Sequence, residues 1–170
     1  MDGQYWLKYL RERRPKYAKK HVSTLERFAN KGKSKSDYSQ FGPIYQIYMY
    51  AFILGFHQRE RIPLPHSPEE RITFLEIGKW QPIETVNYLL MILISHDPIR
   101  DEIGLDLISL EEMTDSDVQE TLKNLINIME EYANAGFSIL EERFESDKYY
   151  FQEPFAFMRL LKEIADGKFH

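Results

Sequence analysis

A stripe of apolar residues with helical spacing runs through the last third of the chain. Its members follow one another at steps of three and four residues: Val118, Leu122, Leu125, Ile126, Met129, Ala133, Gly136, Phe137, Leu140 and Phe144. Thr114 to Asp117 come directly before it and supply the Thr, Ser and Asp side chains that cap helix N-termini. The pattern predicts one helix from Asp117 to about Glu145, and most of the remaining chain must pack along it.

Two further segments are apolar on nearly every side, which is typical of helices that are buried all round. In residues 44–56 the only polar groups are Gln46 and the tyrosine hydroxyls, and Pro43 suits the first turn of a helix. Residues 83–94 follow Pro82 in the same way. We therefore expect these two helices at the centre of the fold, packed against the long helix.

Shorter helices fill most of the remaining sequence, because prolines, glycines and capping residues punctuate it at short intervals. They are predicted over residues 3–13, 15–29 and 67–78, from 97, and from 154 onward. The spacing in the last helix predicts a buried face made of Phe155, Met158, Leu161 and Ile164.

The polar stretch 30–40 contains glycine and lacks an apolar stripe, so it is predicted to be a linker. The expected fold class is all-α, with seven or eight helices in a single globular domain over residues 1–170. Within it we distinguish a basic N-terminal helical arm, residues 1–36, from an acidic helical body, residues 37–170.

The composition excludes several classes of protein. Cysteine is absent, so disulfides, thiolate metal sites and cysteine nucleophiles are excluded, as is usual in a reducing cytoplasm. The N-terminal residues lack the apolar stretch of a secretory signal. The longest apolar run, Tyr88 to Ile94, is far shorter than the ~20 residues of a membrane-spanning helix. We expect a soluble cytoplasmic protein without a membrane partner.

Charge is divided unevenly along the chain. Residues 1–36 contain eleven Lys and Arg side chains against three Asp and Glu, whereas the remaining residues contain eleven against twenty-four. The cations of the basic arm are Lys8, Arg11, Arg13, Arg14, Lys16, Lys19, Lys20, Arg27, Lys31, Lys33 and Lys35. Aromatic residues lie between them, and this mixture suits a phosphate backbone together with stacked bases. The alternative partner is the acid-rich stretch 101–153 of the same or a second chain.

A second candidate site is the loop that follows the first buried helix. It carries His57, Arg59, Glu60 and Arg61, and the prolines at 63 and 65 fix its course. An enzyme reading of this region would use His57, His66 and Glu60 in a metal- or carboxylate-dependent hydrolase or nuclease. No spacing motif for metal ligands, dinucleotides or a hydrolase nucleophile supports that reading, so we predict no catalytic residue, metal or cofactor.

Two segments resemble a known family. Phe41-Gly42-Pro43 leads into Ala51–Phe56, the basic loop Arg59–Leu64 follows, and Glu130–Gly136 lies inside the long predicted helix. This pattern resembles the small helical accessory proteins encoded beside DNA phosphorothioation (Dnd) modification and restriction genes. The resemblance implies a bacterial cytoplasmic accessory protein of a DNA-modification-linked defence system, without known catalytic residues. Asn134 and the loop are the polar positions at which this sequence meets the pattern.

The sequence is therefore compatible with three functions. The first is a non-enzymatic accessory or adaptor protein that contacts DNA, or a DNA-processing protein, through the basic arm. The second is the hydrolase or nuclease described above. The third is an assembly subunit, a homo-oligomer in which the arm of one copy docks on the acidic face of the next.

Overall fold

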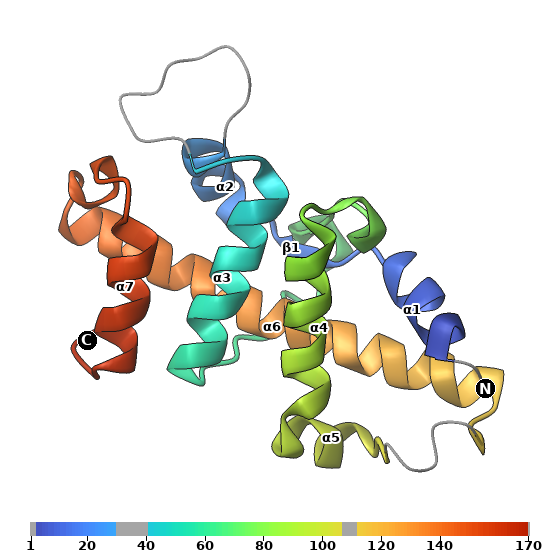
Figure 1. Cartoon of the computed structure of the whole chain (residues 1–170). Helices are drawn as coiled ribbons and strands as arrows, with labels where there is room; N and C mark the ends of the chain where they lie inside the picture. The colour runs from blue at the N-terminus through green and yellow to red at the C-terminus, as the bar shows by residue number, and fades with distance from the viewer. Residues whose placement is uncertain (1–2, 30–40, 107–111, 170) are drawn as a thin grey trace. The chain divides into compact units, whose positions relative to one another are not determined.

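The computed structural model describes residues 3–29, 41–106 and 112–169 (Figure 1). Within these ranges the chain forms seven α-helices, which confirms the predicted all-α class. They are α1 (Gly3–Arg11), α2 (Val22–Phe28), α3 (Ile44–Gln58), α4 (Ile83–Ser95), α5 (Asp97–Ile103), α6 (Asp115–Ser146) and α7 (Ala156–Ala165). Strands β1 (Lys16–Ala18) and β2 (Arg71–Thr73) pair in a two-stranded sheet. Short 3-10 helices are η1 (Lys19–His21), η2 (Pro68–Glu70), η3 (Ile77–Lys79) and η5 (Tyr150–Gln152).

The chain is organised in two compact units, each built from two separate stretches of sequence. Unit 1 contains Met1–Lys16 and Thr73–Met129, and unit 2 contains Tyr17–Ile72 and Glu130–His170. Helix α6 therefore contributes its first half to unit 1 and its second half to unit 2. The basic arm is divided in the same way, because its described cations up to Lys16 belong to unit 1 and the later ones to unit 2.

Unit 1 has a core drawn from α1, α4 and the first half of α6. Leu10, Trp80 and Leu122 are at most 2% exposed. The turn η3 is attached to the end of α1, because the Ile77 N–H donates to the Arg13 carbonyl at 2.9 Å. Burial of these apolar side chains is the main force that holds such a unit together.

Unit 2 is centred on α3, as predicted for the aromatic segment, and α3 packs beside α7 and α2 (Figure 1). Its contact with the second half of α6 is made at glycines. A Cβ atom placed on Gly55 would lie 2.0 Å from the Tyr132 carbonyl oxygen, and one placed on Gly136 would lie 1.7 Å from that of Ala51. Only glycine at both positions allows the two backbones to approach so closely.

Two predicted helices are wrong. Residues 15–29 form β1, η1 and then the short helix α2, because Tyr17 and Ala18 are buried in the strand that pairs with β2. Residues 67–78 form η2, β2 and the beginning of η3 for the same reason. Pairing of two three-residue strands that lie far apart in sequence overrides the local helical pattern.

Two predicted buried faces also need correction. In α7 the side chains of Phe155 and Met158 are 76% and 69% exposed, whereas Phe157 and Leu160 are buried. The helix begins only at Ala156, and the face that meets α3 is set by Phe157 rather than by its neighbours. Helix α4 is buried on one side only, and its Tyr88 and Met91 are 65% and 60% exposed.

The long helix matches its prediction closely, since α6 begins at Asp115 and ends at Ser146. Thr114 caps its first turn, where its Oγ1 accepts from the Asp117 N–H at 3.3 Å. Among the helices of the described residues, none is both long enough and apolar enough to cross a membrane.

Candidate functional site

A buried histidine joins the start of α2 to the second half of α6 within unit 2. His21 is 0% exposed. Its Nδ1 lies 2.8 Å from Glu141 Oε1, and its Nε2 lies 2.8 Å from Asn134 Oδ1. Thr24 Oγ1 donates to the same Glu141 oxygen at 2.5 Å. We call His21, Thr24, Asn134 and Glu141 the histidine cluster.

The orientation of the Asn134 amide is fixed by its other contacts. Its Nδ2 donates to the carbonyl oxygens of Ile62 and Pro63 at 3.0 and 3.2 Å, which leaves Oδ1 to face His21. Because Oδ1 can only accept, His21 Nε2 carries a proton. An ionised Glu141 also only accepts, so the 2.8 Å contact between its Oε1 and Nδ1 is a hydrogen bond when Nδ1 carries a proton.

The carboxyl group of Glu141 favours its ionised form in the folded chain. Burial by itself raises the pKa of Glu141, but hydrogen bonds from His21 and Thr24 and the positive charges of His21 and Lys20 outweigh it, and the pKa is lowered. An ionised carboxylate next to a doubly protonated ring forms a charge-assisted pair. The cluster therefore anchors backbone segments, and the full burial of His21 gives a substrate no access to its ring.

The loop after α3 is held on α6 through Asn134 and its neighbours. Arg61 pairs with Glu131 at 2.6 Å, and the Ile62 N–H donates to the Glu131 carbonyl at 3.2 Å. Together with the two carbonyls bound by Asn134, these contacts fix residues 61–63. Two of the five candidate loop residues, Arg61 and Asn134, therefore hold this loop on α6.

The other loop candidates lie outside the histidine cluster. His57, Arg59 and Glu60 are exposed, and the side chain of Asn134 makes its hydrogen bonds to Ile62, Pro63 and His21 instead. Arg59 ends α3 with φ 58°, in the left-handed region usually occupied by glycine. His66 is also exposed, and in the part of the chain that the structure describes no three His, Asp or Glu residues are grouped so that they could hold a metal ion.

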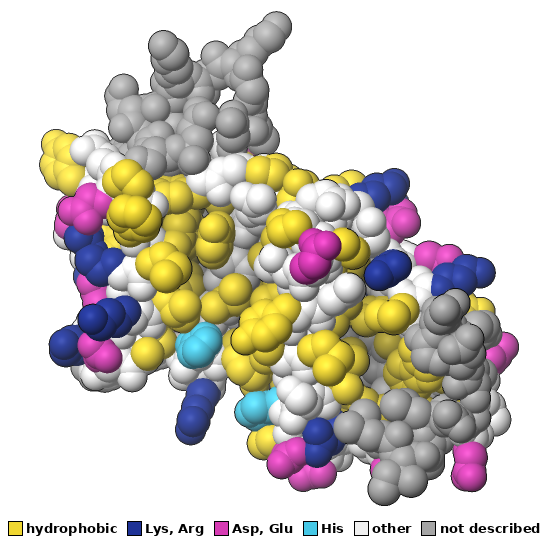
Figure 2. All heavy atoms as spheres, in the orientation of Figure 1, with side chains coloured by type: hydrophobic (Ala, Val, Ile, Leu, Met, Phe, Trp, Pro, Cys, Tyr) yellow, Lys and Arg dark blue, Asp and Glu magenta, His cyan; other side chains and the backbone are white. Residues whose placement is uncertain are grey.

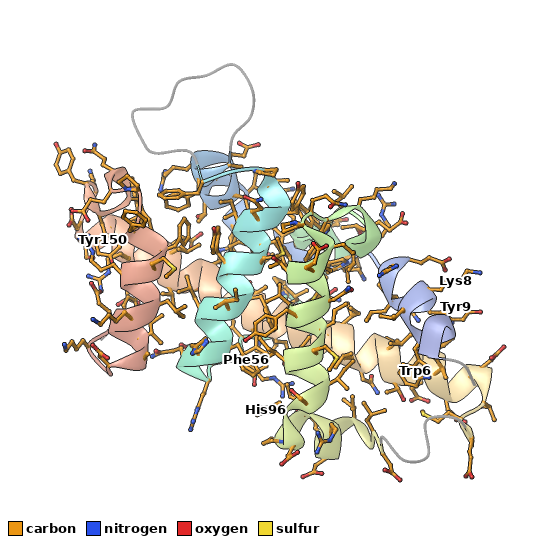
Figure 3. The ribbon with its side chains drawn as sticks, viewed as in Figure 1. Trp6, Lys8, Tyr9, Phe56, His96 and Tyr150 are labelled. Carbon is orange, nitrogen blue, oxygen red and sulfur yellow. The ribbon has the colours of Figure 1, made fainter. Side chains whose placement is uncertain are left out.

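The described cations of the basic arm fall into three groups. Arg13 and Arg27 are committed to packing, because Arg13 donates to the Gln119 backbone and side-chain oxygens and Arg27 lies over the Phe144 ring at 3.9 Å. Arg11 and Lys16 are half-buried. The exposed cations are Lys8, which projects from α1 in Figure 3, together with Arg14, Lys19 and Lys20. Lys31, Lys33 and Lys35 lie outside the described residues.

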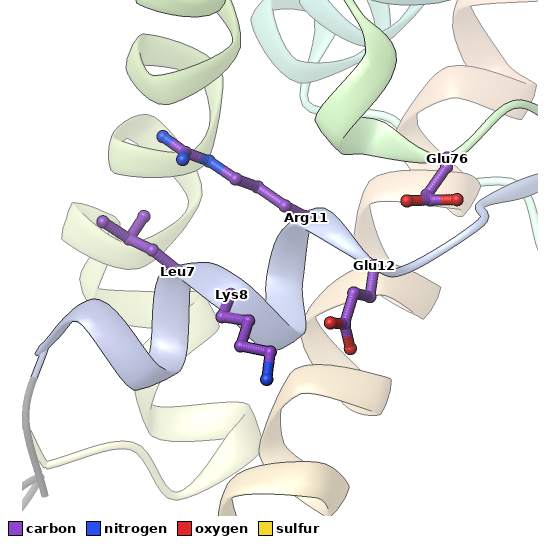
Figure 4. Close-up of a pocket in the computed structure, with 5 residues that line it drawn as sticks. All are labelled: Leu7, Lys8, Arg11, Glu12 and Glu76. Carbon is purple, nitrogen blue, oxygen red and sulfur yellow. The ribbon is translucent and has the colours of Figure 1, made fainter.

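Unit 1 contains a shallow, open pocket of about 500 Å³ beside α1. Leu7, Lys8 and Arg11 line it from the helix, and Glu12 and Glu76 from the segments around it (Figure 4). Its lining contains two cations and two carboxylates, so the pocket has no net preference for an anion. Its polar groups and its openness do not define a small-molecule site.

The histidine cluster could not be predicted from the sequence pattern. His21 lies 113 positions from Asn134 and 120 positions from Glu141, and no periodic signal connects residues at such separations. Asn134 is predicted as a candidate residue because it lies in the segment Glu130–Gly136, which carries the family resemblance. Residues 130–136 supply both the close contact with α3 and the groups that hold the loop.

The chain is similar to one known protein family. No curated protein and no solved structure is significantly similar to the chain. One family model does match, over residues 11–165, and its description is DNA sulphur modification system-associated protein 4. The match covers η1, α2, α3 and all of α6, which are the elements that form the histidine cluster and the glycine contact. The chain therefore belongs to the family of DNA sulphur modification system-associated protein 4.

Proposed function

We propose that this protein is a non-enzymatic accessory component of a bacterial, cytoplasmic DNA-modification-linked defence system and that it contacts DNA through its basic arm. Family membership supports an accessory role beside DNA sulphur modification. The observation that carries the DNA contact is the exposure of Lys8, Arg14, Lys19 and Lys20. Exposed cations clustered in one stretch of chain are the usual means of binding a phosphate backbone.

The local contacts support this assignment. Lys8, Arg14 and Lys19 are exposed, so an external anion can reach their charges. Lys20 lies near enough to Glu141 to lower the pKa of that carboxyl group, so the charge of Lys20 is partly balanced within the chain. Arg13 and Arg27 support the fold through their own contacts, and we assign them no DNA contact.

Because the basic arm is divided between two units, the experiment tests its two parts separately. Lys8 and Arg14 belong to unit 1, and Lys19 and Lys20 belong to unit 2, so each pair is reversed separately. The variants are Lys8→Glu/Arg14→Glu and Lys19→Glu/Lys20→Glu, compared by fluorescence anisotropy with labelled duplex and single-stranded DNA. If all four cations neutralised phosphates, each double reversal would weaken binding by at least tenfold at low salt, since contacts to two phosphates are lost and two repulsive charges are added.

A matched control separates specific contact from total charge. Lys123→Glu/Lys148→Glu changes the net charge by the same amount at two exposed lysines far along the chain. We expect it to reduce affinity much less than either arm variant. If the wild-type protein does not bind DNA at low salt, or if the control and the arm variants weaken binding equally, the proposal is wrong. In the first case the arm would be tested next against the other proteins of the modification system.

A further inference from the structure

The most exposed large apolar side chains of unit 2 include a pair at the beginning of α7. Phe155 and Met158 are 76% and 69% exposed and lie one helical turn apart. Tyr50 of α3 is 37% exposed and stacks on Phe157 of α7, with ring centroids 4.4 Å apart and planes 16° apart. In the space-filling view, hydrophobic side chains gather over α7 and the adjoining part of α3 (Figure 2). We call Tyr50, Phe155 and Met158 the α7 patch.

The α7 patch has the size of the largest apolar patch on a typical single chain, and such patches are often functional. A fully exposed aromatic side chain presents roughly 150–250 Å². Scaled by the exposed fractions, and with Met158 treated as similar in size, the three side chains leave on the order of 350 Å² of apolar surface in water. Contiguous apolar patches of this size on a single chain often mark an interaction site. Phe, Tyr and Met are also among the residues enriched in protein interfaces.

The charges beside the patch indicate its occupant. Glu153 precedes Phe155 and Arg159 follows Met158, and their side chains are 61% and 41% exposed. Along this stretch the order is therefore acid, aromatic, methionine, base. Two copies of the stretch placed antiparallel about a two-fold axis bring each Glu153 to the Arg159 of the other copy, with the apolar residues between them. This is the self-complementarity that an isologous interface requires.

We propose that the α7 patch is the contact surface of a homodimer of this protein. Within one chain Glu153 pairs with Arg159 at 2.6 Å, and in the dimer the same groups exchange partners across the axis. The apolar surface from both copies comes to roughly 700 Å², which is below the about 1,200 Å² at which stable specific interfaces begin. The dimer is therefore weak, and its population depends on protein concentration in the micromolar range.

The first test is sedimentation velocity of the full chain over about 5 to 500 μM. We expect a monomer at the lowest concentration and a dimer of increasing population above it. Met158→Glu places a charge in the centre of the patch and should keep the protein monomeric throughout. Met91→Glu is the matched control, because Met91 is 60% exposed on α4 of unit 1, and this variant should dimerise like the wild type. Thermal melts of both variants check that they remain folded.

The second test addresses the charges. Glu153→Lys places two cations opposite each other in the dimer and should weaken association at least tenfold. Adding Arg159→Glu to it restores opposite charges, and association should return toward the wild-type value. The proposal is overturned if the wild-type protein stays monomeric at 500 μM, if the Met158→Glu protein dimerises normally, or if Met91→Glu abolishes the dimer. Because neither test involves DNA, its outcome is independent of the function proposed above.

Discussion

Replacement of Asn134 by alanine should destabilise the protein by about 3 kcal/mol. The change removes three hydrogen bonds, to the carbonyls of Ile62 and Pro63 and from His21. The largest part of the loss comes from His21 Nε2–H, which is left without an acceptor in a fully buried position. An unsatisfied buried donor costs about 1–3 kcal/mol, and more when it is charged. The loop carbonyls contribute less, because water can reach them once the amide is gone.

The assay is urea unfolding followed by circular dichroism, with a thermal melt beside it. A loss of about 3 kcal/mol corresponds to a fall in Tm of roughly 6–12 °C for a chain of this length. The control is Asn127→Ala, because Asn127 is exposed on the same helix, and its effect should stay within about 0.5 kcal/mol. If Asn134→Ala and Asn127→Ala differ by less than about 1 kcal/mol, the role given to the buried histidine cluster is wrong.

Two further predictions concern the same unit. Gly136→Ala places a Cβ atom 1.7 Å from the Ala51 carbonyl oxygen, so α3 and α6 must separate. The Tm of this variant should fall further below the wild-type Tm than the Tm of Asn134→Ala does. A fall of less than about 3 °C would contradict the close contact. The pKa of Glu141 is lowered in the folded chain, so the unfolded chain binds the proton more readily. The stability that this carboxylate contributes is therefore present above about pH 4.5 and is lost as the pH falls through the folded-state pKa. Glu141→Gln should therefore be less stable than the wild type at pH 6 and approach it by pH 3, as measured by urea unfolding at a series of pH values, whereas a difference that does not change with pH would show that the carboxylate charge is unimportant.

The sequence was most informative where the signal is local and repeated. The apolar stripe of α6 extends over many turns, so the beginning and end of this helix were predicted within two residues. The buried character of α3 followed from its lack of polar side chains. The prediction failed at residues 15–29, where three residues pair with a distant strand and leave no periodic pattern to detect. The exposure of Phe155 was not predicted, because its spacing from the other apolar residues of α7 is compatible with burial on either face of the helix.

The candidate site was predictable only in part. Arg61 and Asn134 were identified from the segments in which they lie, and the structure brings both to the loop after α3. His21, Thr24 and Glu141 were missed, because single polar residues separated by more than a hundred positions reveal their partnership only in the folded chain. The basic arm was visible from charge alone, but packing decides which of its members are exposed. Arg13 and Arg27 look like the other cations in the sequence and differ from them only in their contacts.

The salt dependence of DNA binding tests the proposed function most directly. With four exposed cations on phosphates, the slope of log affinity against log salt concentration should be about −3.6 for duplex DNA, a loss of roughly a hundredfold between 50 and 200 mM salt. Reversal of Lys19 and Lys20 should remove about half of that slope. A wild-type slope near zero, or one that the reversal leaves unchanged, would contradict a role for these exposed lysines in holding the DNA backbone.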